Sequence, residues 1–256
     1  MNGSEEISGT ESNNKIALVI GAGDYIGSAI AKRFAREGYI VHAGRRNGDK
    51  LQPLVEEIES FGGICRGKTL DARKEDAIVG FFAEAEAEAP IDVCIFNVGG
   101  NVHFPILETT ERVFRKVWEL SCYAGFLTGR EAARYMVPRE QGSIFFTGAT
   151  ASLRGGIGYS AFAAAKHGLR GHAQAMAREL GPKNIHVAHL IIDAGVDTAF
   201  VRERIRATMG DDVADNIPEG RLMSPESIAD TYWYLHTQPR DAWTFELDIR
   251  PFAEKW

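Results

Sequence analysis

Short apolar runs alternate along the chain with longer segments in which apolar residues recur every three or four positions. The short runs are typical of buried strands, and the longer segments predict amphipathic helices. Strands are predicted at residues 15–20, 39–44, 64–70, 92–96, 143–147 and 186–192, with a last strand beginning near Thr244. Helices are predicted at residues 28–38, 49–61, 74–88, 110–136 and 159–180. Repeated strand–helix units of this length predict a doubly wound α/β fold, a parallel sheet with helices on both faces.

The first 14 residues, MNGSEEISGTESNN, are low in apolar content and predict a flexible tail. Residues 15–256 continue without a linker or an internal repeat, which indicates a single domain. The chain has 256 residues, of which 45% are hydrophobic and 25% are charged, and this composition is enough for one full core.

The net charge of −6 gives no basic field for a phosphate backbone, so we expect no nucleic-acid partner. No apolar run approaches the roughly 20 residues of a membrane span, and the polar start does not resemble a signal peptide. We therefore expect a cytoplasmic protein that does not enter a membrane. Cys65, Cys94 and Cys122 are widely spaced, and the histidines lack ligand spacing, so no metal site is predicted.

In a parallel α/β sheet the ligand binds at the carboxyl ends of the strands. The first strand ends in GAGDYIG, residues 21–27, which can present backbone N–H groups and a helix N-terminus to a pyrophosphate. The alternative interpretation is a tight turn with no ligand. The second strand ends in Arg45 and Arg46, whose guanidinium groups suit a ribose 2′-phosphate. Two solvated surface arginines are the alternative, and Asp24 in the turn adds an unfavourable charge.

Lys166 lies inside a small-residue helix that otherwise has the pattern of a buried segment. A buried ammonium is costly unless it is paired or used, although a lysine can also extend its head into water. Tyr159, Phe162 and Lys166 are spaced i, i+3 and i+7, so they share one face if the helix includes Tyr159. A phenol and an ammonium on one face could form a proton-transfer pair.

These motifs occur in the order and at the spacing of the short-chain dehydrogenase/reductase family, which the chain resembles over residues 15–250. The resemblance rests on GAGDYIG, on LDA at residues 70–72, on NVGG at residues 97–100, on the Lys166 helix and on DAGVDT at residues 193–198. It implies a single-domain Rossmann fold and a nicotinamide dinucleotide cofactor. Gly21 and Gly27 match the family's glycine turn, whereas Tyr25 replaces the middle glycine and Gly23 is expected to compensate.

The resemblance also implies roles for individual residues. Asp71 is expected to meet the adenine, Asn97 and Gly99 the adenosine ribose, and Thr198 the nicotinamide carboxamide; helix capping is the alternative for Asp71. Arg45 and Arg46 follow the strand after which NAD-selective relatives usually carry an acid, so NADP(H) is expected over NAD(H). The full expected cofactor set is Gly21, Gly23, Tyr25, Ile26, Gly27, Arg45, Arg46, Asp71, Ala72, Asn97, Gly99, Lys166, Val196 and Thr198.

The catalytic positions depart from the family pattern, which makes the chain an atypical member. The family's usual Ser, Tyr and Asn fall on Ala149, Phe162 and Ser121, and only Lys166 is retained. Phe and Ala side chains cannot donate a proton or polarise a carbonyl. Tyr159 offers a Tyr-x6-Lys spacing, which is similar to the enoyl-reductase branch of the family.

A packing role is the alternative for Tyr159, and Ser152 or a bound water is the next candidate donor.

The expected function is NADP(H)-dependent reduction of a conjugated C=C or a carbonyl in a small to medium apolar substrate. The lining is expected to come from Phe200, Val201 and Ile205. The alternative is a dinucleotide-binding protein that has lost turnover and acts as a redox sensor or partner subunit. Relatives commonly pair through the helices at residues 110–136 and 159–180, so a homodimer or homotetramer is expected.

Overall fold

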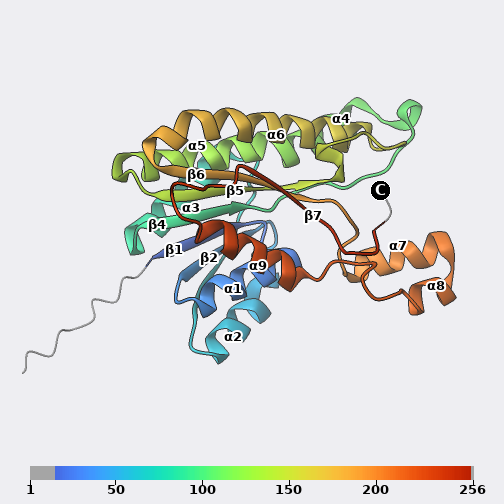
Figure 1. Cartoon of the computed structure of the whole chain (residues 1–256), viewed down its shortest axis with the longest axis horizontal. Helices are drawn as coiled ribbons and strands as arrows, with labels where there is room; N and C mark the ends of the chain where they lie inside the picture. The colour runs from blue at the N-terminus through green and yellow to red at the C-terminus, as the bar shows by residue number, and fades with distance from the viewer. Residues whose placement is uncertain (1–14, 255–256) are drawn as a thin grey trace, which may run out of the picture.

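The computed structural model describes residues 15–254, within which seven parallel strands form one sheet in the order β3-β2-β1-β4-β5-β6-β7 (Figure 1). The strands are β1 (Ile16–Ile20), β2 (Ile40–Arg45), β3 (Ile64–Thr69), β4 (Ile91–Phe96), β5 (Gly142–Ala149), β6 (Ile185–Ile192) and β7 (Glu246–Ile249). The predicted doubly wound α/β fold is therefore confirmed. The predicted tail, residues 1–14, lies outside the described residues.

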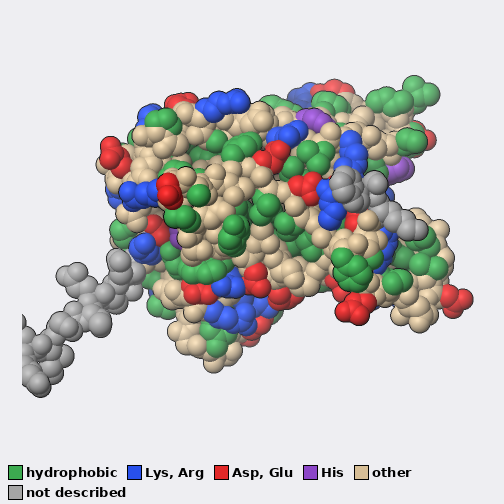
Figure 2. Space-filling model, in the orientation of Figure 1, with side chains coloured by type: hydrophobic (Ala, Val, Ile, Leu, Met, Phe, Trp, Pro, Cys, Tyr) green, Lys and Arg blue, Asp and Glu red, His purple; other side chains and the backbone are tan. Residues whose placement is uncertain are grey.

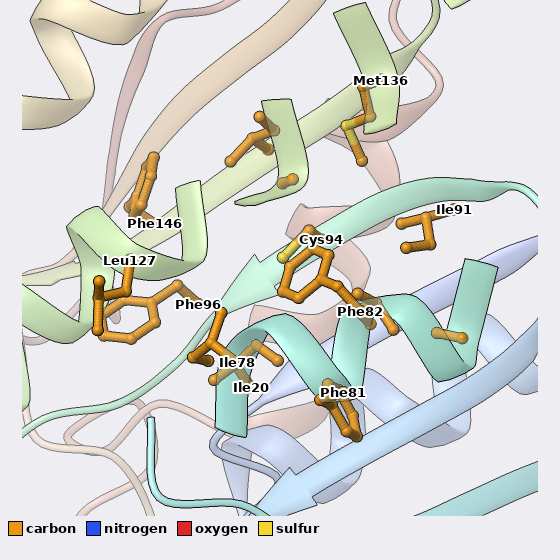
Figure 3. Packing of buried hydrophobic residues seen from close by; sticks show 14 of the residues in the cluster. Ile20, Ile78, Phe81, Phe82, Ile91, Cys94, Phe96, Leu127, Met136 and Phe146 are labelled. Atoms are coloured by element: carbon orange, nitrogen blue, oxygen red, sulfur yellow. The ribbon is translucent and has the colours of Figure 1, made fainter. Parts of the chain in front are cut away.

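Helices cover both faces of the sheet because the strand side chains point alternately to one face and the other. On β1, Ile16, Leu18 and Ile20 join one buried cluster, and Ala17 and Val19 join the other. The first cluster is closed by α3 (Glu75–Glu88), α5 (Ala124–Met136) and α6 (Ser160–Leu180), and Figure 3 shows its packing. The second is closed by α1 (Ile26–Arg36), α2 (Gln52–Ser60) and α9 (Pro225–His236) (Figure 1).

The helix predicted at residues 110–136 is not one uninterrupted α-helix. It consists of α4 (Glu111–Trp118), a π-helical turn (Glu119–Tyr123) and α5. Within the turn, the Ser121 hydroxyl accepts a hydrogen bond from the Gly100 backbone N–H at 3.0 Å. Single π turns inside α-helices are often found at functional sites.

Three helices after β6 were not predicted, namely α7 (Ala199–Met209), α8 (Asp211–Asp215) and α9. The 3₁₀ segments are η1 (Gly48–Leu51), η2 (Ile106–Glu108), η4 (Val137–Arg139), η5 (Thr150–Ser152) and η6 (Gly181–Lys183). The segment around η2 and the α7–α8 pair project at one end of the body (Figure 1), and Figure 2 shows hydrophobic side chains on both. Between residues 15 and 254, no helix is long and apolar enough to cross a membrane.

A polar cluster lies at the amino end of the sheet, opposite the end where ligands bind in this fold. The Asp92 carboxylate accepts hydrogen bonds from Tyr39 at 2.7 Å, Gln141 at 3.0 Å and Lys15 at 3.2 Å. Burial by itself would raise the pKa of Asp92, but hydrogen bonds from His236 and Tyr39 outweigh it and hold that pKa well below its usual range. This carboxylate therefore joins β1, β4 and α9 and stabilises the fold when ionised.

Asp92→Asn should lower the free energy of unfolding at pH 7 by about 1 to 3 kcal/mol, because the donors around this buried carboxylate lose a charged acceptor. The folded-state pKa is depressed, so the contribution is complete above the unfolded-state pKa of about 4 and is lost as the pH falls toward the folded-state value. Urea denaturation should therefore show a smaller difference from wild type at pH 3 than at pH 7. Asp230→Asn, at an exposed ion pair with Arg33, is the matched control and should change little. Equal effects of the two variants would contradict the assignment.

Candidate active site

A cleft of about 510 Å³ opens at the carboxyl ends of β1 to β4. It lies at the point where the strand order reverses, because β1 pairs with β2 on one side and with β4 on the other. Its lining residues are Ile20, Gly21, Gly23, Gly44, Arg45, Arg46, Asn47, Lys50, Leu70, Ala72, Asn97, Val98, Gly99 and Leu120. Seven of the residues predicted to bind the cofactor are in this set: Gly21, Gly23, Arg45, Arg46, Ala72, Asn97 and Gly99.

The glycine turn owes its shape to two glycines and its open space to a third. Gly21 has a φ of +95°, and a Cβ there would lie 2.7 Å from the Asn97 carbonyl oxygen. A Cβ on Gly27 would lie 2.3 Å from the Gly21 carbonyl oxygen. A Cβ on Gly23, in contrast, would meet no atom within 4 Å. Since α1 begins at Ile26, the space beside Gly23 adjoins a helix N-terminus and fits a pyrophosphate.

Tyr25, which stands in place of a glycine, extends from the turn to α7. It is the N-cap residue of α1, and its hydroxyl accepts a hydrogen bond from the Ala199 backbone N–H at 3.0 Å. The neighbouring Thr198 is the N-cap of α7 and accepts from the Val201 N–H at 3.1 Å, while Val196 pairs with Met223 in an isolated bridge. The structure thus brings the predicted DAGVDT contacts up to the glycine turn.

The Asn97 side chain holds the turn in place. Its amide nitrogen donates to the Gly21 carbonyl at 3.1 Å, and its amide oxygen accepts from the Thr147 hydroxyl at 3.1 Å. The Tyr232 hydroxyl lies 2.7 Å from Thr147 Oγ1 and donates to it, because the Thr147 proton is already used. One amide N–H and one lone pair of the amide oxygen remain on Asn97 for the predicted ribose contact.

Three cations line one end of the cleft: Arg45, Arg46 and Lys50. Arg45 is partly neutralised, because its Nη1 lies 2.5 Å from an Asp24 carboxylate oxygen and also donates to the Lys50 carbonyl at 3.3 Å. Arg46 is exposed. The predicted cationic end of the cleft is therefore present. Because Asp24 pairs with Arg45, Arg46 is the arginine for which Asp24 competes less with a bound phosphate.

Asp71 is held by its own neighbour. Both of its carboxylate oxygens accept hydrogen bonds from the Arg73 guanidinium, at 2.9 and 2.7 Å, and these hydrogen bonds hold the pKa of Asp71 below its usual range. The alternative role as helix cap is wrong, because the N-cap of α3 is Lys74. Ala72, rather than Asp71, lines the cleft.

The Lys166 ammonium is buried, so the interpretation that it extends into water is wrong. Only 4% of the residue is exposed, and its Nζ donates to the Thr147 carbonyl at 2.7 Å and to the Val98 carbonyl at 3.4 Å. A Cβ built on Gly99, in the cleft lining, would lie 3.6 Å from this Nζ. Burial lowers the pKa of Lys166 to about 8, with nearby Cys122 opposing the shift. An ammonium has three donors, so one N–H remains beside the cleft.

Tyr159 lies just before the Lys166 helix rather than within it. The helix α6 begins at Ser160, and Tyr159 is its N-cap residue. The Tyr159 hydroxyl accepts a hydrogen bond from the Arg204 guanidinium, and its ring meets His103 edge-on with centroids 4.9 Å apart. Tyr159 and Lys166 were expected to share a helix face only if the helix included Tyr159. That condition is therefore not met. The phenol and the ammonium have separate partners in this part of the chain.

Ser152 lies in the protein interior. Its exposed fraction is 0%, its hydroxyl accepts from the Ala149 N–H at 3.2 Å, and His189 Nε2 lies 3.5 Å away. A hydroxyl without access to solvent cannot meet a substrate, so we remove Ser152 from the candidate donors. Phe162 and Ala149 belong to a small apolar cluster, and the Phe162 ring lies 5.9 Å from Lys166 Nζ.

Sequence reasoning missed several contributors to the site. Asn47, Lys50 and Leu120 also line the cleft, and Arg204 binds the Tyr159 hydroxyl. The sequence spacing of Lys50 and Arg45 does not indicate a shared site, because the 3₁₀ segment η1 brings the two residues together only in the folded chain. Arg204 belongs to RERIR, residues 202–206, and the alternating charges of this segment are the sequence signal that could have identified it.

The reversed strand order, the glycine turn and the buried lysine together define a dinucleotide-binding α/β protein. The family profile described as short chain dehydrogenase matches residues 15–208, and the chain belongs to this family. The fold of this family binds a nicotinamide dinucleotide. The crowding at Gly21 and Gly27 and the open space at Gly23 are features of this chain that fit such a group.

Individual relatives agree with this assignment. The chain is 57% identical to a short-chain dehydrogenase from Rhodopseudomonas palustris, with 94% of this chain and 99% of that one covered and a TM-score of 0.80. It is 33% identical over 232 residues to 2-dehydro-3-deoxy-D-gluconate 5-dehydrogenase from Formosa agariphila, with 89% and 87% covered. Actinorhodin polyketide ketoreductase with NADPH is 24% identical with a TM-score of 0.84, over 94% of this chain and 97% of that one, and this likeness concerns the fold alone.

Proposed function

We propose that the protein is an NADP(H)-dependent reductase that adds hydrogen to a conjugated C=C or a carbonyl. The observation that carries the proposal is the Lys166 ammonium, which is buried against the cleft lining with one N–H left over. A dinucleotide-binding protein without turnover is the second candidate. It draws support from Ala149, Phe162 and Ser121, which we propose replace the family's usual Ser, Tyr and Asn.

Several residues are proposed to bind the cofactor, which supplies a hydride when bound. The N–H groups around Gly23 would hold the pyrophosphate, and the remaining Lys166 N–H would bind a ribose hydroxyl. Arg46, with Arg45 and Lys50, would face the adenosine 2′-phosphate. The position of these three cations at one end of the cleft supports NADP(H) over NAD(H).

Tyr159 is proposed to supply the proton. Its hydroxyl is bound to Arg204 through the oxygen, so its own proton is still available to donate. The nearby apolar cluster of Val117, Ala151 and Phe162 would exclude water and leave no second side-chain donor at these positions. This setting suits a conjugated C=C, in which the hydride acceptor and the proton acceptor are different carbons.

We also propose that the protein assembles through α6 and α5. Four small residues of α6, Ala164, Gly168, Gly171 and Ala175, form an exposed stripe at i, i+4, i+7 and i+11. Ala163, the small residue before Ala164, is buried against its own chain and lies outside this stripe. Beside the stripe, exposed Phe126 of α5 packs edge-on against His172. Small residues allow two helices to approach closely, so this face suits pairing with a second copy.

The cofactor proposal predicts that titration calorimetry will show NADPH binding more tightly than NADH, by roughly 1 to 3 kcal/mol for one charge-assisted contact. Arg46→Ala should remove much of that preference and leave NADH affinity unchanged. Asp24→Asn should increase it, because Arg45 is then released from its ion pair. Arg36→Ala, at the C-terminal end of α1 and outside the cleft lining, is the control. Equal affinities of wild type for the two dinucleotides would remove the arginine argument.

The proton-donor proposal predicts that Tyr159→Phe lowers kcat by about 10² to 10⁴, the usual effect of losing a general acid, and leaves NADPH affinity nearly unchanged. Lys166→Met should reduce both kcat and NADPH affinity. Wild-type turnover should decline as the pH rises through about 8, because the Lys166 ammonium is lost there. The measurement is steady-state oxidation of NADPH with a panel of enones and carbonyls. Full turnover by Tyr159→Phe would contradict the assignment, and wild-type inactivity with tight NADPH binding would favour the second candidate.

The assembly proposal predicts a dimer or tetramer in light scattering at micromolar concentration. Gly171→Arg should dissociate it, because a long side chain blocks close helix packing. A Cβ on Gly171 would meet no atom within 4 Å, so the variant should keep its fold, as circular dichroism can check. A wild-type protein that elutes as a monomer would be inconsistent with this prediction.

A further inference from the structure

Three arginines of α7 have different electrostatic partners. Arg202 forms a two-point ion pair with Asp197, at 2.5 and 2.8 Å. Arg206 pairs with Asp211 at 3.0 Å and with Asp215 at 2.6 Å. Arg204 differs from both, since its guanidinium bonds the Tyr159 hydroxyl and lies 5.5 Å from the centre of that ring. Among residues 15–254, the contacts of this guanidinium are thus with an uncharged group.

The location of Arg204 links it to the proposed chemistry. Tyr159 directly precedes α6, the helix that carries Lys166, and the start of α7 is bonded to the glycine turn through Tyr25. The segment before Tyr159 is also bonded to the loop after β4, through the Phe104 N–H and the Gly158 carbonyl at 2.8 Å. Arg204 therefore places a positive charge beside the proposed proton donor, and the nearby sequence carries two exposed apolar side chains, Phe200 one turn earlier in α7 and Ile157 two residues before Tyr159.

We propose that Arg204 binds a carboxylate on the substrate, so that the substrate is an oxo acid or an enone acid with an apolar body. This inference rests on the proposed function and names the substrate class of the same site. It modifies the expectation of a wholly apolar substrate.

Arg204 suits a substrate carboxylate because of the partner that it would give up. An incoming carboxylate would replace a neutral phenol on Arg204, and two parallel N–H···O bonds to a carboxylate are stronger than one bond to a neutral oxygen. Arg202 and Arg206 would only exchange one carboxylate for another. The ring of Tyr159 keeps the guanidinium plane in position, which lowers the ordering cost of binding. Once the carboxylate takes the guanidinium, the Tyr159 hydroxyl is free to turn toward the reacting atom.

The test is titration calorimetry of the full-length protein with 4-oxopentanoate and with its methyl ester, which differ in charge but share the oxo group. Wild type should bind the acid about 10- to 100-fold more tightly than the ester. Arg204→Met should abolish this preference, and Arg204→Lys should keep part of it, because the charge remains but the fork is lost. Arg206→Met removes a charge from the same helix and is the matched control, which should keep the full preference.

Two results would overturn the inference. One is equal affinity for acid and ester, including no measurable binding of either probe. The other is a preference for the acid that survives in Arg204→Met. If that variant instead loses NADPH affinity while the preference survives, Arg204 serves a cofactor phosphate and the inference fails. The titrations are run with and without NADPH, so that failure of this inference can be told apart from failure of the proposed function. Failure to bind NADPH would contradict the proposed function, whereas normal NADPH binding without charge selectivity would contradict only this inference.

Discussion

The buried ammonium of Lys166 is the constraint on which the site depends. Moving a charge out of water is costly, and here the cost is offset by the carbonyl groups of Thr147 and Val98, which mark the ends of β5 and β4. A single cation thus fixes two adjacent strand ends relative to α6. The Thr147 hydroxyl extends the same arrangement to Asn97, and through it to the carbonyl of Gly21. The lysine, the strand ends and the glycine turn consequently form one connected polar structure at the carboxyl end of the sheet.

Much of the fold could be predicted from the sequence because the five inner strands, β2, β1, β4, β5 and β6, are mostly apolar runs that are buried on both faces. The strand predictions differ from the observed bounds by one or two residues, and the order of strands and helices follows from the repeated pattern. The π turn at Glu119–Tyr123 could not be predicted, because its residues are compatible with an ordinary α-helix. The helix α7 was missed because it buries none of its residues, and a helix without a buried face has no apolar periodicity to detect.

The candidate site was predicted less completely than the fold, for reasons that are particular to each residue. The glycine turn and the cationic strand end were found because their chemistry depends on residues close in sequence. Ser152 was misjudged because its burial depends on packing against residues distant in sequence, such as His189 on β6, which only folding brings close. The helix that carries Lys166 begins at Ser160, so Tyr159 is its N-cap residue, and a shift of one residue at a helix end is beyond what local sequence determines.

Tyr25 has a consequence for how distant parts of the chain respond to one another. A glycine in its place would leave the turn and α7 independent, whereas the Tyr25 hydroxyl bonds the Ala199 N–H directly. The helix it holds has no buried residues of its own, so polar contacts such as this bond and the Arg204–Tyr159 bond fix its position. Thermodynamic linkage requires such a coupling to act in both directions. Whatever displaces the tyrosine must also change the energy of α7, and whatever draws α7 inward must change how readily the turn accepts a ligand.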